Sequence, residues 1–448
     1  MFHRMTLVLS LVLASAPLFD VVAAPKCGTK ADPCVSLTAD FSTLLHAWND
    51  TDFDPTPRYF DVDGQTQGQV ATFFTPTLRL RTNDRLELTY RLELGWNGWS
   101  RNDPGMPNQF LGGANDSLAA RHKEIWLGWS EDGIDLRVGF QRIEDPSRLF
   151  VDHHAGALQI GFGSKTSRIS FLAAQLPDST YEGLNVAEDN FRTDTFLFGA
   201  AYRRALTPQV ALDTALYQVL DRQRVRRPLN LTTAMLGLDV AHGGYTAWFH
   251  VLGQTGSWDN SALNETDATI LSYALQAGAT QTVAQWTWGL NVFAVSADDD
   301  YAGNEQQRAF YGSAKNRSRT RLLTEDEMRD RYDNLDERMG TFWGAFVVNP
   351  AGLSVADLSL AYRVGSDYHI TLVAGTGTTL NQHRSLGSRY VGTEVSLSQT
   401  LKLTRSAAVS LTALMFAPGQ AASAFINDID RRATQYLYGG MMGINASF

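Results

Sequence analysis

The chain has no long apolar run beyond its first residues. After the N-terminal segment, no part of the 448-residue sequence is an uninterrupted apolar stretch of about 18 residues, the length that a transmembrane helix requires. The sequence therefore excludes a helical membrane anchor in the mature protein. One short apolar run does occur, from Met5 to Leu13. It follows basic residues and precedes small ones, which predicts a secretory signal peptide over residues 1–23.

Cysteine is nearly absent, since the chain contains only Cys27 and Cys34. Export places both in an oxidising compartment, which favours a local disulfide within a periplasmic N-terminal tail over residues 24–34. Two unpaired thiols in this tail are the alternative interpretation. Neither cysteine lies in a C-x-x-C-H motif or behind a lipoprotein cleavage box. The sequence thus predicts neither haem attachment nor lipidation, and no cofactor is expected.

Basic tracts and nucleotide-binding motifs are also missing. With a formal net charge of −9 at pH 7, the chain does not suit nucleic acid as a partner. The absence of a nucleotide-binding fingerprint implies that any transport runs down a gradient. The stretch before the second predicted strand is too short for the plug domain of an energised receptor.

What the sequence does contain is a strict alternation of apolar and polar residues. The clearest example opposes one apolar set to one polar set, namely Leu86, Leu88, Tyr90, Leu92, Leu94 and Trp96 against Glu87, Thr89, Arg91 and Glu93. A period of two indicates an extended strand with one apolar and one polar face. The last stretch has the same pattern and ends on Phe448. It resembles the closing strand of bacterial outer-membrane barrels.

The alternating segments follow one another as hairpins with brief turns and long polar loops. Four such pairs are 157–163 with 167–176, 194–204 with 208–219, 232–241 with 244–253, and 268–279 with 282–296. This layout predicts an all-β fold, a transmembrane antiparallel up-and-down β-barrel over residues 35–448, with both termini in the periplasm. An even strand number then requires that Met339 to Val348 belong to one long extracellular loop, about 297–352. The total is about eighteen strands in a single domain in the bacterial outer membrane.

Phasing these strands also predicts which charged residues face the lumen. The inward cations are Arg79, Arg81, Arg91, Arg137, Arg168, Arg203, Arg363 and Lys402. The inward acids are Glu87, Glu93, Glu124, Asp135, Asp213, Asp357 and Glu394. One interpretation is a salt-bridged wall whose charges neutralise one another. The other is a pore lining in which guanidinium groups replace part of the hydration of anionic solutes.

Other patterns leave functional alternatives open. Thr324 and Glu327 form a capping-box pattern that predicts a helix to Arg338 in the long loop, either solvated or folded into the mouth of the pore. His153 and His154 are the best local candidates for a barrel hydrolase or a metal site, although adjacent histidines on one loop are commonly incidental. The acidic run 298–300 suits Ca²⁺ or simply solvent. We assign no catalytic or metal-binding residue from these patterns.

A family resemblance rests on the order of the elements, on the phrase from Leu136 to Arg142 after a tight hairpin, and on the closing strands. These features resemble the alginate-export family of outer-membrane porins. The family commonly has a second arginine where this chain has Phe140. The resemblance implies an eighteen-stranded barrel whose arginine-lined lumen passes an anionic polysaccharide.

The expected function is therefore passive passage or export of hydrophilic solutes, with anionic sugars or a polysaccharide such as alginate as candidates. The expected partners are outer-membrane lipid and the solute, while assembly partners in the periplasm are not identified. An outer-membrane hydrolase, a structural or adhesive barrel with a sealed lumen, and a soluble exported β-protein are the alternatives.

Overall fold

The computed structural model describes most of the chain. The described residues are 34–48, 67–82, 85–96, 118–164, 166–176, 195–222, 229–258, 267–298, 306–313, 315–324, 341–343, 346–382, 387–422 and 436–448. The predicted signal peptide, Cys27 and the predicted helix beyond Thr324 lie outside these residues. Cys34 is disulfide-bonded.

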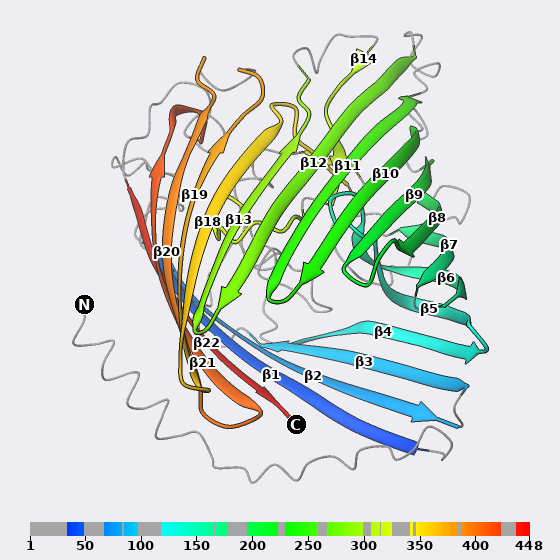
Figure 1. Cartoon of the computed structure of the whole chain (residues 1–448), viewed down its shortest axis with the longest axis horizontal. Coiled ribbons are helices and arrows are strands. Elements are labelled where there is room, and N and C mark those ends of the chain that lie inside the picture. The colour runs from blue at the N-terminus through cyan, green and yellow to red at the C-terminus, as the bar shows by residue number, and fades with distance from the viewer. Residues whose placement is uncertain are drawn as a thin grey trace.

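Eighteen antiparallel strands form the wall of a closed barrel (Figure 1). In chain order they are β1 (Cys34–Trp48), β2 (Gln67–Arg81), β3 (Leu86–Trp96), β4 (Leu118–Glu131), β5 (Ile134–Glu144), β6 (Asp152–Gly163), β7 (Ser167–Leu176), β8 (Thr195–Ala205), β9 (Val210–Asp221), β10 (Leu229–His242), β11 (Tyr245–Trp258), β12 (Ala268–Val283), β13 (Trp286–Val295), β18 (Leu353–Val364), β19 (Tyr368–Thr378), β20 (Tyr390–Lys402), β21 (Ala407–Pro418) and β22 (Leu437–Ser447). The predicted fold class and strand number are confirmed.

The barrel closes because the first strand pairs with the last. β1 and β22 are antiparallel from Asp40 opposite Ser447 to Trp48 opposite Gly439. Ala39 and Phe448 exchange both backbone hydrogen bonds beyond this ladder. Closure leaves no open sheet edge along the paired part of the wall, as a hydrocarbon environment requires.

The outer face of the wall is apolar, as the alternation predicts. Outward side chains such as Phe171, Phe249 and Leu358 are 45%, 47% and 61% exposed. Their neighbours along each strand point into the barrel and are buried or half-buried. Among the described residues, no helix is long and apolar enough to cross a membrane. The strands carry the apolar surface instead, and this surface fits lipid.

The two ends of the barrel differ. Short turns such as 243–244 and 284–285 lie at one end of the barrel. β1 begins and β22 ends at this same end. The opposite end carries the longer connections, of which the longest runs from β13 to β18. Within it, β14 (Gln306–Gln307) pairs with β12. Three further short strands form a separate small sheet, namely β15 (Tyr311–Gly312), β16 (Thr341–Trp343) and β17 (Phe346–Val348).

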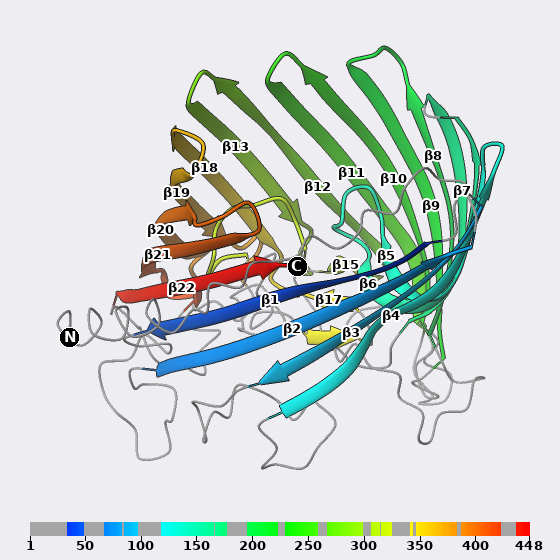
Figure 2. The same ribbon diagram turned by 90° about the horizontal axis from the view of Figure 1, so that it is seen from below.

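The β5–β6 hairpin leaves the wall before it ends. β5 pairs with β4 only as far as Phe140, and β6 pairs with β7 only from Gly156 onward. Residues 141–155, here called the hairpin tip, pair only with each other or form the turn between the strands. At the departure point Gly139 has φ +132°, and a Cβ there would lie 2.2 Å from the Ile125 carbonyl oxygen. Glycine therefore permits the bend. Figure 2 shows the turn inside the ring of strands.

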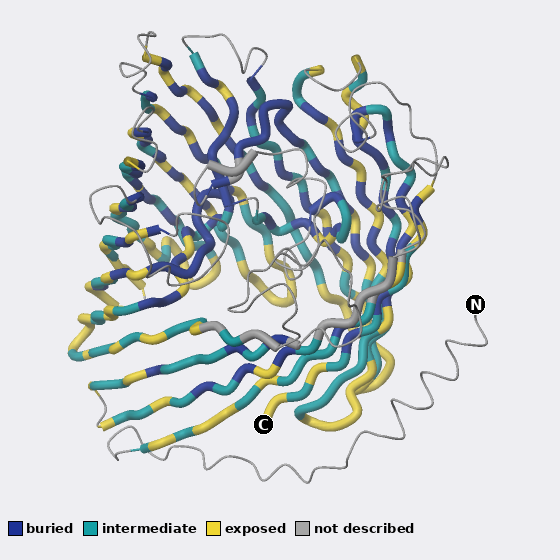
Figure 3. Tube along the Cα trace, turned by 180° about the vertical axis from the view of Figure 1, so that it is seen from behind, coloured by how far each residue is buried: buried dark blue, intermediate teal, exposed yellow. Residues whose placement is uncertain are grey.

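Apolar side chains fill much of the lumen beside the hairpin tip. Phe150 is fully buried between the rings of Tyr217 and Phe346, at centroid distances of 5.5 and 5.3 Å. A second cluster near the other side of the wall includes Leu323 and Phe416. Buried segments accordingly lie inside the barrel in Figure 3. Side chains thus pack across part of the interior, and we call this packed region the partition. The partition, together with the wall, sets the width of the passage.

Candidate functional site

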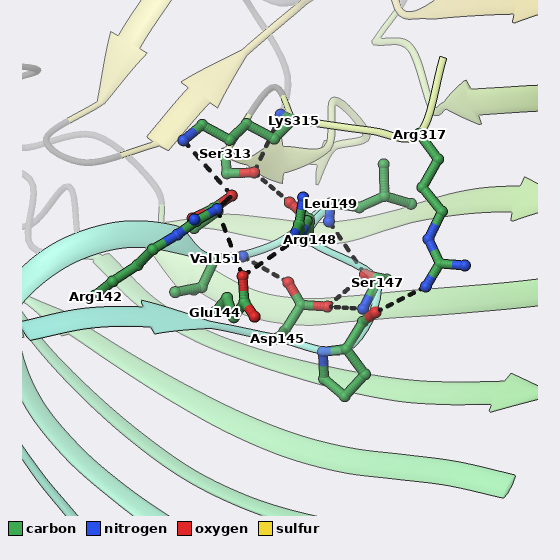
Figure 4. A network of polar contacts seen from close by, with 12 residues as sticks. Arg142, Glu144, Asp145, Ser147, Arg148, Leu149, Val151, Ser313, Lys315 and Arg317 are labelled. Carbon is green, nitrogen blue, oxygen red and sulfur yellow. Dashed lines mark hydrogen bonds and ion pairs between the residues drawn. The ribbon is translucent and has the colours of Figure 1, made fainter. Parts of the chain in front are cut away.

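Two segments far apart in sequence meet inside the barrel. One is the hairpin tip, and the other is residues 306–324 of the β13–β18 connection, here called the inward loop. The Ser313 N–H donates to the Leu149 carbonyl at 3.0 Å, and the Ser313 hydroxyl donates to the Arg148 carbonyl. Figure 4 shows the polar contacts of this region from close by, and we call the two joined segments the constriction.

A buried carboxylate shapes the turn of the hairpin tip. Asp145 accepts hydrogen bonds from the backbone N–H groups of Ser147 at 2.8 Å, Phe150 at 3.1 Å and Val151 at 2.8 Å. Burial raises the pKa of the Asp145 carboxyl, and these hydrogen bonds oppose the shift. Aspartate stabilises such turns by bonding to the backbone that follows it. The sequence Asp-Pro-Ser therefore builds a turn that can stand away from the wall.

Next to this turn, a second buried carboxylate holds two cations. Arg142 donates two hydrogen bonds to Asp152, both at 2.7 Å, and the Lys315 ammonium lies 3.5 Å from the same carboxylate. The Asp152 side chain is only 1% exposed, whereas Arg142 is 42% exposed. The acid is therefore buried, whereas the side chain of the cation that it binds remains partly exposed.

An exposed acid completes the charge cluster. Glu144 lies 3.5 Å from Arg142 and 3.4 Å from Arg148. Three cations of the constriction thus face two carboxylates, one of which is buried. The accessible surface here is more positive than a count of charges implies, because Asp152 is shielded from solvent.

A cavity of about 590 Å³ lies against this constriction. Glu144 and Pro146 of the hairpin tip contribute to its lining, and strands β2 to β9 with Arg85 of the β2–β3 turn supply the rest. Five residues that the sequence predicts to line the lumen meet in this cavity, namely Arg81, Glu87, Asp135, Arg137 and Arg168.

Those five residues are partly neutralised by pairing. Arg81 lies 3.2 Å from Glu87, and Arg168 lies 2.6 Å from Asp135. Arg137 instead stacks over the Trp126 ring at 4.2 Å. A guanidinium on an aromatic face keeps its charge and its outer N–H donors. Arg137 is therefore the cation of this cavity that is best placed to meet a solute.

The other predicted lumen residues lie elsewhere. Three of them form ion pairs: Arg91 lies 3.5 Å from Glu124, Glu93 lies 2.7 Å from Lys123, and Arg203 lies 3.0 Å from Asp213. Arg79 is exposed on β2, and Arg363 is exposed beside the turn that ends β18. The structure thus brings part of the predicted set together and separates the rest.

Sequence reasoning missed the cations of the constriction. Arg148, Lys315 and Arg317 lie in connections, where the strand period does not apply. The sequence does contain one signal for this basic segment, an alternation of cations with polar residues at Lys315, Arg317, Arg319 and Arg321. Such an alternation inside a long connection indicates an extended basic segment. Burial lowers the pKa of Arg317, and the nearby Asp239 opposes that shift.

The histidine pair of the sequence analysis lies within the hairpin tip. His153 and His154 are both buried, and adjacent residues of an extended strand point to opposite faces. The His154 ring stacks on Phe140 at 6.2 Å, and its Nε2 lies 3.8 Å from Glu124. In the part of the chain that the structure describes, no three His, Cys, Asp or Glu residues gather as a metal site. Asp298 is buried, and its two acidic neighbours lie outside the described residues.

Comparisons with known proteins identify the architecture. No family model and no curated protein sequence match the chain. Solved structures do match. OccAB2 of Acinetobacter baumannii has a TM-score of 0.60 at 11% identity, covering 92% of this chain and 98% of its own. OccK9 (OpdG) of Pseudomonas aeruginosa has a TM-score of 0.57 at 12% identity, with the same coverage. OpdK of Pseudomonas aeruginosa with vanillate has a TM-score of 0.55 at 11% identity, again with that coverage.

The chain has the fold of an outer-membrane porin. These neighbours are Occ and Opd porins, so they support the predicted barrel but not the alginate-export family. The closed barrel and its apolar outer face agree with a place in the bacterial outer membrane.

Proposed function

We propose that this protein is a passive outer-membrane channel for small hydrophilic solutes, with its termini and short turns in the periplasm. Solutes pass beside the constriction that the hairpin tip and the inward loop form together, and they cross the adjoining cavity. The closed wall and the polar, charged cavity within it support this proposal. A gradient drives the passage, since the sequence contains no nucleotide-binding fingerprint.

The preferred solutes are anions, and carboxylates above all. The observation that carries this choice is the placement of charge at the constriction, where Arg142 and Arg148 are 42% and 39% exposed while Asp152 is buried. Planar guanidinium groups match carboxylate geometry. Arg137 on Trp126 would offer a cation and an aromatic ring to the same solute. Vanillate, which is present in the OpdK structure, has a carboxylate that suits the cation and an aromatic ring that suits Trp126, and it is a suitable probe.

Uptake into proteoliposomes tests this function. Vanillate should enter vesicles that contain the purified protein faster than vanillyl alcohol, its uncharged counterpart, because only vanillate gains from the exposed guanidinium groups. Empty vesicles correct for leakage through lipid. Equal rates for the two compounds would contradict anion preference, and no uptake of either would contradict the channel itself.

Export of an anionic polysaccharide such as alginate is a second candidate. The resemblance of residues 136–142 to the alginate-export family favours it, because Arg137 of that phrase lines the cavity. Short uronate oligomers that block the current at lower concentration than vanillate would support this candidate. Block that weakens as the oligomer grows would refute it.

A further inference from the structure

One wall residue is bonded to both segments of the constriction. Gln276 points inward from β12 and is fully buried. Its Oε1 accepts a hydrogen bond from the backbone N–H of Arg317 at 2.9 Å. Its Nε2 donates to the backbone carbonyl of Ser147 at 3.2 Å. A single amide group therefore ties the inward loop and the hairpin tip to the wall.

The side chain of Arg317 makes a second tie between the same parts. Its Nη2 donates to the Pro146 carbonyl of the hairpin tip at 3.5 Å, as Figure 4 shows. Its Nη1 lies 3.6 Å from Asp239 on β10. Its guanidinium carbon lies 5.1 Å from the centre of the Trp248 ring on β11. Backbone and side chain of this residue thus connect the hairpin tip with three neighbouring strands.

The wall is shaped to receive this arginine. A Cβ on Gly278 of β12 would lie 2.4 Å from the Trp248 ring, and a Cβ on Gly237 of β10 would lie 2.4 Å from the His250 ring. Both rings therefore lie against bare backbone, where a side chain would displace them. The Trp248 ring thus lies against bare backbone at Gly278, and the guanidinium of Arg317 lies over the same ring.

We propose that Gln276 and Arg317 are positioning residues that hold the hairpin tip and the inward loop as one fixed constriction. This joint makes the constriction a static filter, and the two segments do not move as separate gates. The inference deepens the proposed channel function and rests on it. Other contacts fix single parts of the inward loop, such as Gln254, which bonds both backbone groups of Tyr311.

Hydrogen exchange of the folded, full-length protein in detergent micelles tests the joint directly. Gln276→Met keeps the length of the side chain and removes both hydrogen bonds. Exchange in residues 145–151 and 315–318 should accelerate about 5- to 10-fold, because local opening becomes easier by roughly the net value of the lost bonds. Gln276→Glu keeps the acceptor for Arg317 but lacks the donor for Ser147. It should accelerate exchange in the hairpin tip and spare 315–318.

Gln159 supplies the matched control. It points inward from β6 and makes no side-chain hydrogen bond within the described residues, so Gln159→Met should leave exchange in both segments unchanged. Heat-modifiable migration on gels shows that each variant has a folded barrel. Unchanged exchange in a folded Gln276→Met protein would overturn the joint, as would equal acceleration in the Gln159 variant.

Single-channel recording adds a functional readout. Gln276→Met should raise the noise of the open-channel current in a protein that still migrates as a folded barrel on unheated gels. Open-channel noise equal to that of the unaltered protein would refute the fixed-filter account. If the unaltered protein fails to conduct, the proposed channel function fails, but the exchange experiment still decides whether the joint exists.

Discussion

Neutralising one acid at the constriction should strengthen its attraction for anions. Glu144 is 47% exposed and lies within 3.5 Å of both Arg142 and Arg148. Its carboxylate occupies the position that the carboxylate of a passing solute would take between the two guanidinium groups. Glu144→Gln keeps the shape of the side chain and removes this competitor.

The size of the effect follows from the exposure of the pairs. Each exposed ion pair contributes about 0.2–1 kcal/mol, so the two contacts together amount to about 1 kcal/mol. A difference of about 1 kcal/mol corresponds to roughly fivefold tighter binding of a carboxylate. Salt screens exposed charges, so the gain should shrink between about 0.1 and 1 M salt.

Block of the single-channel current by vanillate measures this change. Glu144→Gln should lower the half-blocking concentration about fivefold at low salt. Asp40→Asn is the control, because Asp40 lies 3.8 Å from Arg91 and neither residue lines the cavity beside the constriction. Weaker or unchanged block in the Glu144 variant, or the same gain in the control, would refute the assignment of the constriction as the anion site.

Three further predictions concern stability and membrane fit, each measured on the purified protein. Glu394 accepts three backbone N–H bonds from residues 321–323 of the inward loop. Glu394→Leu should cost about 3 kcal/mol or more in the denaturant unfolding free energy, and no loss would contradict this anchoring. Phe150→Ala should cost about 3–5 kcal/mol, because Phe150 is fully buried between two rings; a loss below about 1 kcal/mol would show that the partition is loosely packed. Leu358→Arg should impair folding into lipid vesicles by about 2–4 kcal/mol, since Leu358 is an outward residue in the middle of β18, whereas Leu358→Phe should fold normally.

The barrel wall could be predicted because the pattern that specifies each strand lies within that strand's own sequence. Each strand alternates between lipid and interior, so residues such as Leu86 to Trp96 carry the period of two in the sequence itself. A barrel with both termini on the same side must have an even number of strands, and this requirement led to the prediction of about eighteen. The lumen charges were phased by the same rule, which is why Arg81, Asp135 and Arg168 were selected from sequence.

The constriction was not predictable because its contacts join distant segments. The bond between Gln276 and Ser147 spans 129 positions, and that between Arg317 and Pro146 spans 171. Neither inward segment is a membrane-facing strand, so no lipid boundary imposes a period on it. The departure of the hairpin tip depends on Gly139, and an isolated glycine within a strand pattern does not indicate which way the chain bends.

The reversal potential across a planar bilayer under a KCl gradient is the most direct test of the central claim, that exposed arginines at an internal constriction make this barrel an anion-preferring channel. The unaltered protein should give a reversal potential of the sign set by chloride. The Arg142→Ala, Arg148→Ala double variant should shift it toward zero or toward the cation side. A cation-selective unaltered protein, or a double variant with the same reversal potential, would contradict the account.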